Sequence, residues 1–139
     1  MNTNRTISQT ATDIEKAVNE VNRLVNIKYK EYEQLKDLES QHLSEQREKM
    51  NTLGNAKITA LVNLNIDTPE HRAKISRVRQ KHSEKMRKFD EDVAKQMRFY
   101  KRAYLSDCNT AIKQTCLKYD LNVKIIKRIL GRDLKTEMS

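Results

Sequence analysis

The sequence offers three groups of residues that could carry chemistry: a run of carboxylates, a few histidines and cysteines, and a long basic segment. The carboxylates Asp90, Glu91 and Asp92 are consecutive. On a helix, consecutive side chains point about 100° apart, whereas a general acid and a general base must converge on one substrate. The run therefore indicates a solvated helix face that pairs with Lys or Arg, and we predict that the protein is not an enzyme.

The histidines and cysteines lack the spacing of metal ligands. A metal on a helix is held by histidines four residues apart, and His42, His71 and His82 are widely separated. We therefore interpret His82 as a tolerated polar residue among apolar neighbours and Cys108 as a small core residue. The two glycines stand alone, so the sequence has no glycine-rich phosphate loop. We expect no metal, no cofactor and no small-molecule substrate.

The cysteines also bear on the compartment. On one helix, Cys108 and Cys116 would lie too far apart for a disulfide. Unpaired cysteines predict a reducing compartment, with an intermolecular bridge as the alternative. No run of about 18 apolar residues is present for a membrane span, and the polar segment 1–12 lacks the apolar run of a secretory signal. We expect an intracellular protein, cytoplasmic or nuclear, that is not secreted.

The basic segment is the strongest candidate for binding. Residues 71–102 contain 12 Lys or Arg against 4 Asp or Glu, in a chain whose net charge is +9. Such clusters attract nucleic-acid phosphates without sequence preference and with steep salt dependence. The residues that we assign to this candidate interface are Lys74, Arg77, Arg79, Lys81, Lys85, Arg87 and Lys88.

The alternative is that these charges pair between two helices. They flank an apolar stripe, where coiled coils place charges that pair across helices. In the register proposed below, Glu48 lies near Lys85 and Arg87. A membrane surface fits the segment less well, because lipid binding needs an apolar face that is free to insert, and this stripe is committed to helix packing.

The composition predicts long helices. The chain has two Gly and one Pro in 139 residues, of which 34% are charged, so few sharp turns can form. Thr68 can cap a helix and Pro69 suits its first position, while Gly131 is a typical C-terminal stop. We predict an all-α fold with one arm at about 5–64, a turn at 65–68, a second arm at about 69–130 and a frayed tail at 132–139.

The second arm carries the clearest apolar pattern. From Ile75 onward, residues that are apolar except at His82, Thr115 and Asn122 follow one another in steps of 3, 4 and 4, an eleven-residue repeat that is typical of a nearly straight helix. We predict one uninterrupted helix to about residue 130. The stripe consists of Ile75, Val78, His82, Met86, Phe89, Val93, Met97, Tyr100, Tyr104, Cys108, Ala111, Thr115, Tyr119, Asn122 and Ile126.

The first arm is less regular. Apolar residues keep helical spacing from Ile7 to Val25 and become sparser further along. Gly54 costs roughly 1 kcal/mol in a helix interior. Together with Asn55 it either kinks the helix or breaks it, in which case a short separate helix covers residues 56–64.

Folding the chain at the turn places apolar residues of one arm opposite those of the other. In this antiparallel register Met50 faces Met86, and four tyrosines form one layer. We therefore predict a single helical-hairpin domain over residues 1–131, in which the two arms pack as an antiparallel coiled coil. The tyrosines of the layer are Tyr29, Tyr32, Tyr100 and Tyr104.

Near the chain ends, both arms carry apolar residues outside the packing stripe. Helices that are apolar on two faces expect a second partner, and a two-helix hairpin buries little surface alone. We predict self-association into a four-helix bundle, or docking on another helical protein. The function that follows is a non-enzymatic helical interaction or assembly subunit, with nucleic-acid binding as the alternative. The predicted contact residues are Leu24, Ile27, Phe99, Leu105, Ile112, Leu117, Leu121 and Ile125.

Overall fold

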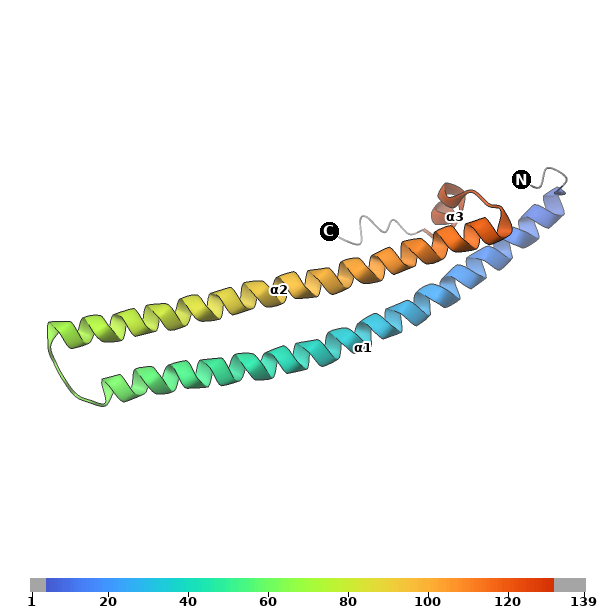
Figure 1. The fold of residues 1–139 in the computed structure, drawn as a ribbon. Coiled ribbons are helices and arrows are strands. Elements are labelled where there is room, and N and C mark those ends of the chain that lie inside the picture. Colours follow the sequence, from blue (N-terminus) through green and yellow to red (C-terminus); the bar gives the residue numbers. More distant parts are fainter. Residues whose placement is uncertain (1–4, 132–139) are drawn as a thin grey trace. The chain divides into compact units, whose positions relative to one another are not determined.

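The computed structural model of the protein describes residues 5–131 and shows three helices there. They are α1 (Ile7–Val62), α2 (Pro69–Tyr119) and α3 (Val123–Leu130) (Figure 1). All other described residues lie in short connections, which confirms the all-α prediction. The predicted frayed tail at 132–139 lies outside the described residues.

Two units share α1 and α2. The terminal unit comprises Met1–Leu35 and Phe99–Ser139, and the central unit comprises Lys36–Arg98. In each unit α1 and α2 pack against each other. The single domain over residues 1–131 and the coiled-coil character of the packing stay predictions.

In the central unit, the turn between the two helices has the predicted local structure. Val62 ends α1, and Asn65 adopts a left-handed backbone with φ of 54°, which asparagine tolerates better than most residues. Thr68 caps α2, because its hydroxyl accepts the His71 backbone N–H at 3.1 Å. Pro69 is the first residue of α2, where its missing N–H costs no helical hydrogen bond.

Of the two alternatives at Gly54, the break does not occur, and α1 continues as one helix to Val62. The contacts of the central unit show that α1 and α2 run in opposite directions. Residues with lower numbers on α1 contact residues with higher numbers on α2. These hydrogen bonds join Leu61 to His71 (2.8 Å), Asn51 to His82 (3.0 Å), Arg47 to Asp90 (2.8 Å) and Glu39 to Gln96 (3.4 Å).

The terminal unit holds a core to which all three helices contribute. Its fully buried side chains come mainly from α2, and α1 adds two valines while α3 adds one isoleucine. Figure 1 shows α3 lying back beside the end of α2. The core residues are Val21, Val25, Leu105, Cys108, Ile112, Cys116 and Ile126.

The prediction of one uninterrupted helix from 69 to about 130 is wrong, because α2 ends at Tyr119. Asp120 has a left-handed backbone with φ of 52°. The side chain of Asn122 then accepts the backbone N–H groups of Lys124 (2.9 Å) and Ile125 (3.4 Å) and so caps a new helix. The predicted stop at Gly131 is confirmed, since its φ of 64° is left-handed.

The apolar stripe of the second arm is confirmed up to this break. Every member from Ile75 to Tyr119 is buried or half-buried. Asn122 is the exposed member, and its side chain is used to cap α3. The repeat thus describes the packed face of α2, and its last two positions belong to the turn and to α3.

Candidate interaction surfaces

A layer of tyrosines lies between α1 and α2 in the terminal unit. The rings of Tyr32 and Tyr104 stack with centroids 5.0 Å apart, and Tyr29 meets Tyr104 edge to face at 5.9 Å. Both arrangements are favourable for aromatic pairs. The predicted layer is therefore confirmed for these three rings, whereas the ring of Tyr100 meets Phe99 on its own helix at 6.1 Å.

Several apolar residues that were predicted to contact a partner are buried by other parts of the same chain. Leu105 and Ile112 are 1% and 0% exposed, so their assignment to an external contact surface is wrong. Leu121 is half-buried and packs against the same core. The physical reason is that the turn at Asp120 lets α3 fold back beside α2 (Figure 1), so that valines of α1 and Ile126 of α3 share one buried cluster with Leu105 and Ile112.

The other predicted contact residues keep more of their surface. Leu24 is half-buried, and Ile27 is 43% exposed on α1. On α2, Phe99 is 67% and Leu117 81% exposed. Ile125 on α3 is 51% exposed, so these five remain available at the surface of the terminal unit.

The structure adds a neighbour to Ile125 that the sequence reasoning missed. Ile129 is 50% exposed and lies one helical turn further along α3. On the adjoining part of the same side of α3, Ile126 is fully buried, and Val123 and Leu130 pack against the core. The short helix thus has one broad apolar face, of which the part with Ile126 is covered and the part with Ile125 and Ile129 is not. The spacing of four residues could have shown this pair, had α3 been recognised as a separate helix.

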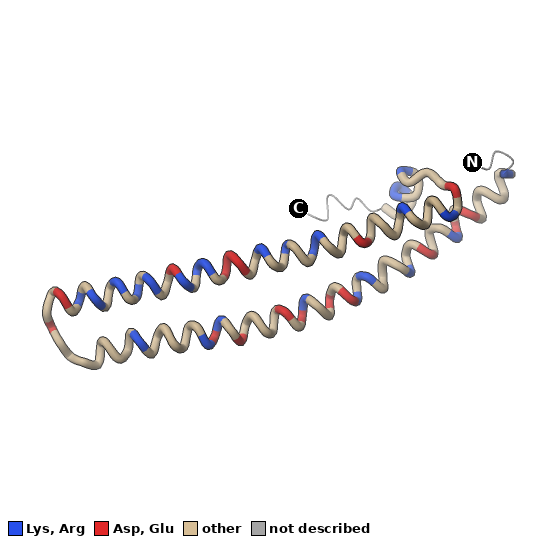
Figure 2. The backbone as a smooth tube through the Cα atoms, in the orientation of Figure 1, with Lys and Arg blue, Asp and Glu red and all other residues tan. Residues whose placement is uncertain are grey.

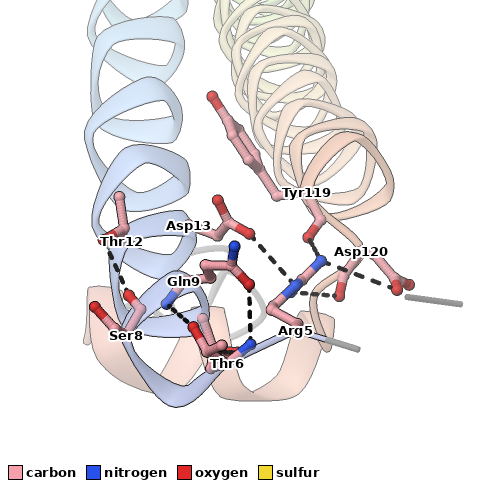
Figure 3. A network of polar contacts seen from close by, with 9 residues as sticks. Arg5, Thr6, Ser8, Gln9, Thr12, Asp13, Tyr119 and Asp120 are labelled. Carbon is pink, nitrogen blue, oxygen red and sulfur yellow. Dashed lines mark hydrogen bonds and ion pairs between the residues drawn. The ribbon is translucent and has the colours of Figure 1, made fainter. Parts of the chain in front are cut away.

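The start of the chain is tied to the end of α2 through Arg5, a residue that the sequence reasoning missed (Figure 3). Its guanidinium donates to the backbone carbonyls of Tyr119 at 2.6 Å and Asp120 at 3.3 Å. Arg5 Nε also lies 3.4 Å from a carboxylate oxygen of Asp13, and the side chain is 13% exposed. A cation at the carbonyl end of a helix is stabilising, so Arg5 supports the turn that leads to α3.

A capping box positions this arginine. The hydroxyl of Thr6 accepts the Gln9 backbone N–H, and the Gln9 side chain accepts the Thr6 backbone N–H, both at 3.0 Å (Figure 3). Such reciprocal bonds satisfy two donors at a helix start. The Thr-x-x-Gln spacing is a local signal that could have placed the beginning of α1 from the sequence.

All seven basic residues of the candidate nucleic-acid interface are exposed on α2. Figure 2 shows Lys and Arg following one another along this part of the helix. Arg87 binds Glu84 and Glu91 on its own helix, which lowers the pKa of Glu84 below its ordinary value. Within residues 5–131, the remaining six form no ion pair; they are Lys74, Arg77, Arg79, Lys81, Lys85 and Lys88.

The predicted pairing of Glu48 with Lys85 and Arg87 is not found in the structure. The ion pair between the helices in this region has the reverse polarity, with Arg47 on α1 and Asp90 on α2. The hydrogen bond from the Arg47 guanidinium holds the pKa of Asp90 below its ordinary value. Since Asp90 is one of the few acids on this part of α2, the pair leaves the basic surplus of α2 uncompensated.

A groove of about 340 Å³ lies between α1 and α2 in the central unit. Its floor includes Gly54 and His82, and a Cβ on residue 54 would lie 2.0 Å from His82 Nδ1. Gly54 therefore permits the imidazole to lie against the backbone of α1. The other residues that line the groove are Met50, Leu53, Lys57, Val78, Lys81 and Lys85.

The cysteines and histidines form no reactive or metal-binding arrangement in the part of the chain that the structure describes. Cys108 and Cys116 form no disulfide with each other and are fully buried, which confirms Cys108 as a small core residue. Burial raises the pKa of the Cys116 thiol, and the nearby Lys127 opposes this. Across residues 5–131, no group of three metal-ligating side chains is present, and no helix has the length and apolarity to cross a membrane.

Comparisons of the chain with protein-family models, with curated proteins and with solved structures find no match. The exposed face of α3, the unpaired cations of α2 and the groove beside Gly54 are therefore the features from which a function can be argued.

Proposed function

We propose that the protein is a non-enzymatic helical interaction or assembly subunit. In this proposal α1 and α2 form an antiparallel coiled coil, and the terminal unit associates with a second copy to complete a four-helix bundle. The observation that supports it is the uncovered part of the apolar face of α3, where Ile125 and Ile129 lie one turn apart and half-exposed. An apolar helix face that its own chain covers only in part can bury the remainder against a partner.

The free energy of burying these isoleucines favours a second copy of the chain as the partner. Fully burying an isoleucine side chain stabilises by about 1.5–3 kcal/mol, and a two-fold interface uses each exposed residue twice. Ile125 and Ile129 from two copies supply four isoleucines, each of which has about half of its surface left to bury. Two packed helices bury little apolar surface alone, so association through this face stabilises the subunit as well as the assembly.

The test is the oligomeric state of the full chain by light scattering. We expect a dimer or a larger species for the native sequence and a monomer for the double variant Ile125→Glu and Ile129→Glu. Lys124→Glu with Arg128→Glu is the matched control, because both residues are exposed on the same helix and acquire the same carboxylates. Leu121 is a poor choice, since its half-buried side chain also supports the core of a single chain.

Circular dichroism distinguishes a loss of association from a loss of helical structure in these variants. The helix content of the isoleucine variant should equal that of its control, because both changes are at exposed positions. A native chain that stays monomeric at high concentration contradicts the proposal. So does an isoleucine double variant that associates as strongly as the native chain.

A second candidate function is nucleic-acid binding without sequence preference through the basic part of α2. It is favoured by the six exposed cations that form no ion pair within residues 5–131. Lys and Arg that neutralise phosphates release condensed counterions, so affinity falls steeply with salt. The predicted interface is the set of seven basic residues described above, although Arg87 already has two carboxylate partners.

This candidate is tested by mobility shift with duplex DNA at low salt. The quadruple variant Lys74→Glu, Arg77→Glu, Lys81→Glu and Lys85→Glu should lose binding. The matched control carries the same charge change at exposed residues elsewhere: Lys16→Glu, Lys30→Glu, Lys113→Glu and Lys124→Glu. Equal binding by both variants, or no binding by the native chain, rejects nucleic acid as the ligand of this helix.

A further inference from the structure

We propose that the groove beside Gly54 is a docking site for an acidic amphipathic helix of a partner protein. The occupant would insert apolar side chains between α1 and α2 and place carboxylates against the surrounding lysines. This surface belongs to the central unit, whereas the self-association proposed above uses α3 in the terminal unit. The inference therefore goes beyond that proposal and can fail or hold without it.

The floor of the groove is apolar and includes side chains that the chain itself leaves uncovered. Leu53 is 73% exposed, and Met50 and Val78 are half-buried. Gly54 has no side chain, and the His82 ring occupies the place that a Cβ of residue 54 would take. Burial of an exposed leucine in such a floor is the main favourable term for a docking helix.

The rim of the groove is cationic. Lys57 comes from α1, and Lys81 and Lys85 lie one turn apart on α2. All three are exposed and form no ion pair within the described range 5–131. Three like charges around one groove repel a basic partner and attract carboxylates. Since exposed ion pairs add little affinity, the rim chiefly selects the partner while the floor supplies binding energy.

The shape of the groove favours a helix over a nucleic acid. Its volume of about 340 Å³ lies near the lower end of the range for sites that enclose a ligand, roughly 300–1,000 Å³, and so suits a few side chains. No Phe, Tyr or Trp lines it, so it offers no platform on which a base could stack. An amphipathic helix presents apolar side chains three and four residues apart. Side chains at this spacing can insert into a hydrophobic groove.

The probe for the test is a designed, fluorescein-labelled helical peptide of about 18 residues, long enough to be helical in water. It carries leucines three and four residues apart on one face and glutamates on both sides of them. Fluorescence anisotropy of this peptide is measured against the full-length protein. We expect saturable binding that weakens with salt, and much weaker binding of the same peptide with glutamine in place of each glutamate.

Three variants of the protein locate the site. Leu53→Ser should weaken peptide binding about tenfold, the equivalent of losing much of one buried leucine. Lys81→Gln with Lys85→Gln should weaken binding and reduce its salt dependence. The matched control, Lys74→Gln with Arg77→Gln, removes the same charge from the same helix outside the groove and should bind the peptide nearly as well as the native chain.

The outcomes separate this inference from its competitors. No binding of the acidic peptide, or unchanged binding by Leu53→Ser, overturns it. A loss with Lys74→Gln and Arg77→Gln as large as with the groove lysines also overturns it, and indicates a polyanion such as nucleic acid on the whole basic row. The variant Ile125→Glu and Ile129→Glu should still bind the peptide, so failure of self-association leaves this result intact.

Discussion

The imidazole of His82 lies against the backbone of α1 at Gly54, where a Cβ would come within 2.0 Å of Nδ1, 2.2 Å of Cε1 and 2.7 Å of Cγ. The whole ring stands in the way, so it cannot yield by a small movement of its tip. Nε2 of the same ring donates to Oδ1 of Asn51 at 3.0 Å. Gly54 thus has a packing role in a helix that its conformational freedom would otherwise weaken.

Gly54→Ala is therefore expected to destabilise the protein, although alanine is the better helix former. The gain in helix propensity is about 1 kcal/mol. The forced movement of His82 costs about 1–3 kcal/mol, and the lost bond to Asn51 about 0.5–1.5 kcal/mol more. We expect a net loss of about 0.5–3.5 kcal/mol in the free energy of unfolding, measured by chemical denaturation.

The background variant His82→Ala reverses the sign of this effect. With the ring removed, Gly54→Ala has only its propensity gain and should stabilise by up to about 1 kcal/mol. If Gly54→Ala stabilises the native background as much as the His82→Ala background, the ring does not require glycine at this position.

The ion pair between Arg47 and Asp90 predicts a pH dependence. Because the folded-state pKa of Asp90 is lowered, its contribution to stability is present above its unfolded-state pKa. That contribution is lost as the pH falls through the lowered folded-state pKa. Asp90→Asn should thus be less stable than the native chain near pH 7, and the difference should vanish in strong acid. Urea denaturation at a series of pH values measures it.

Asp92→Asn is the matched control for this titration. Asp92 is exposed on the same stretch of α2 and has no ion pair within residues 5–131. We expect its stability to follow that of the native chain at every pH. A difference between Asp90→Asn and the native chain that stays constant from neutral pH to strong acid contradicts the role of the Asp90 carboxylate.

Asn122 should control how firmly α3 covers the core. Asn122→Ala removes the side chain that accepts two backbone N–H groups of α3, at a cost of about 0.5–2 kcal/mol. The cover over Cys116 then opens more often, so labelling of the buried thiols by a thiol reagent should accelerate about 2- to 30-fold. Asn122→Asp keeps the acceptor and should label at nearly the native rate. Equal rates for both variants would show that the cap does not hold α3.

Arg5 should stabilise the end of α2 through its bonds to the carbonyls of Tyr119 and Asp120. Arg5→Ala leaves these acceptors to water and should lower the free energy of unfolding by about 1–3 kcal/mol. Arg5→Lys should recover only part of the loss, since an ammonium cannot copy the planar fork of a guanidinium. Thermal denaturation of the three chains tests this. If Arg5→Lys is as stable as the native chain, the positive charge of Arg5 alone accounts for its contribution.

The features that the sequence determined by itself are local ones. Thr68 and Pro69 placed the start of α2, and Gly131 placed the end of α3, because a cap or a left-handed residue acts on its own few neighbours. The eleven-residue repeat identified the packed face of α2 correctly up to Tyr119, since periodicity needs only the geometry of one helix. The capping box at Thr6 and Gln9 is equally local and could have been found.

Other features depended on which side chains meet across the fold. Asn122 and Ile126 continue the repeat, so a straight helix and a turn into α3 fitted the sequence equally well. The choice follows from the apolar face at Leu105 and Ile112, which gains most when the chain folds back over it. Gly54 was judged by helix propensity alone, and only the approach of His82 explains it.

For the charged residues, too, the sequence determined one feature and the tertiary structure another. The sequence determined that α2 is basic, because composition is independent of conformation. Only the tertiary structure decided that Arg47 pairs with Asp90 while Lys81 and Lys85 keep no carboxylate partner within residues 5–131. The reason is that pairing depends on the directions of side chains from two packed helices, and these directions are set by the packing of residues such as Gly54 and His82.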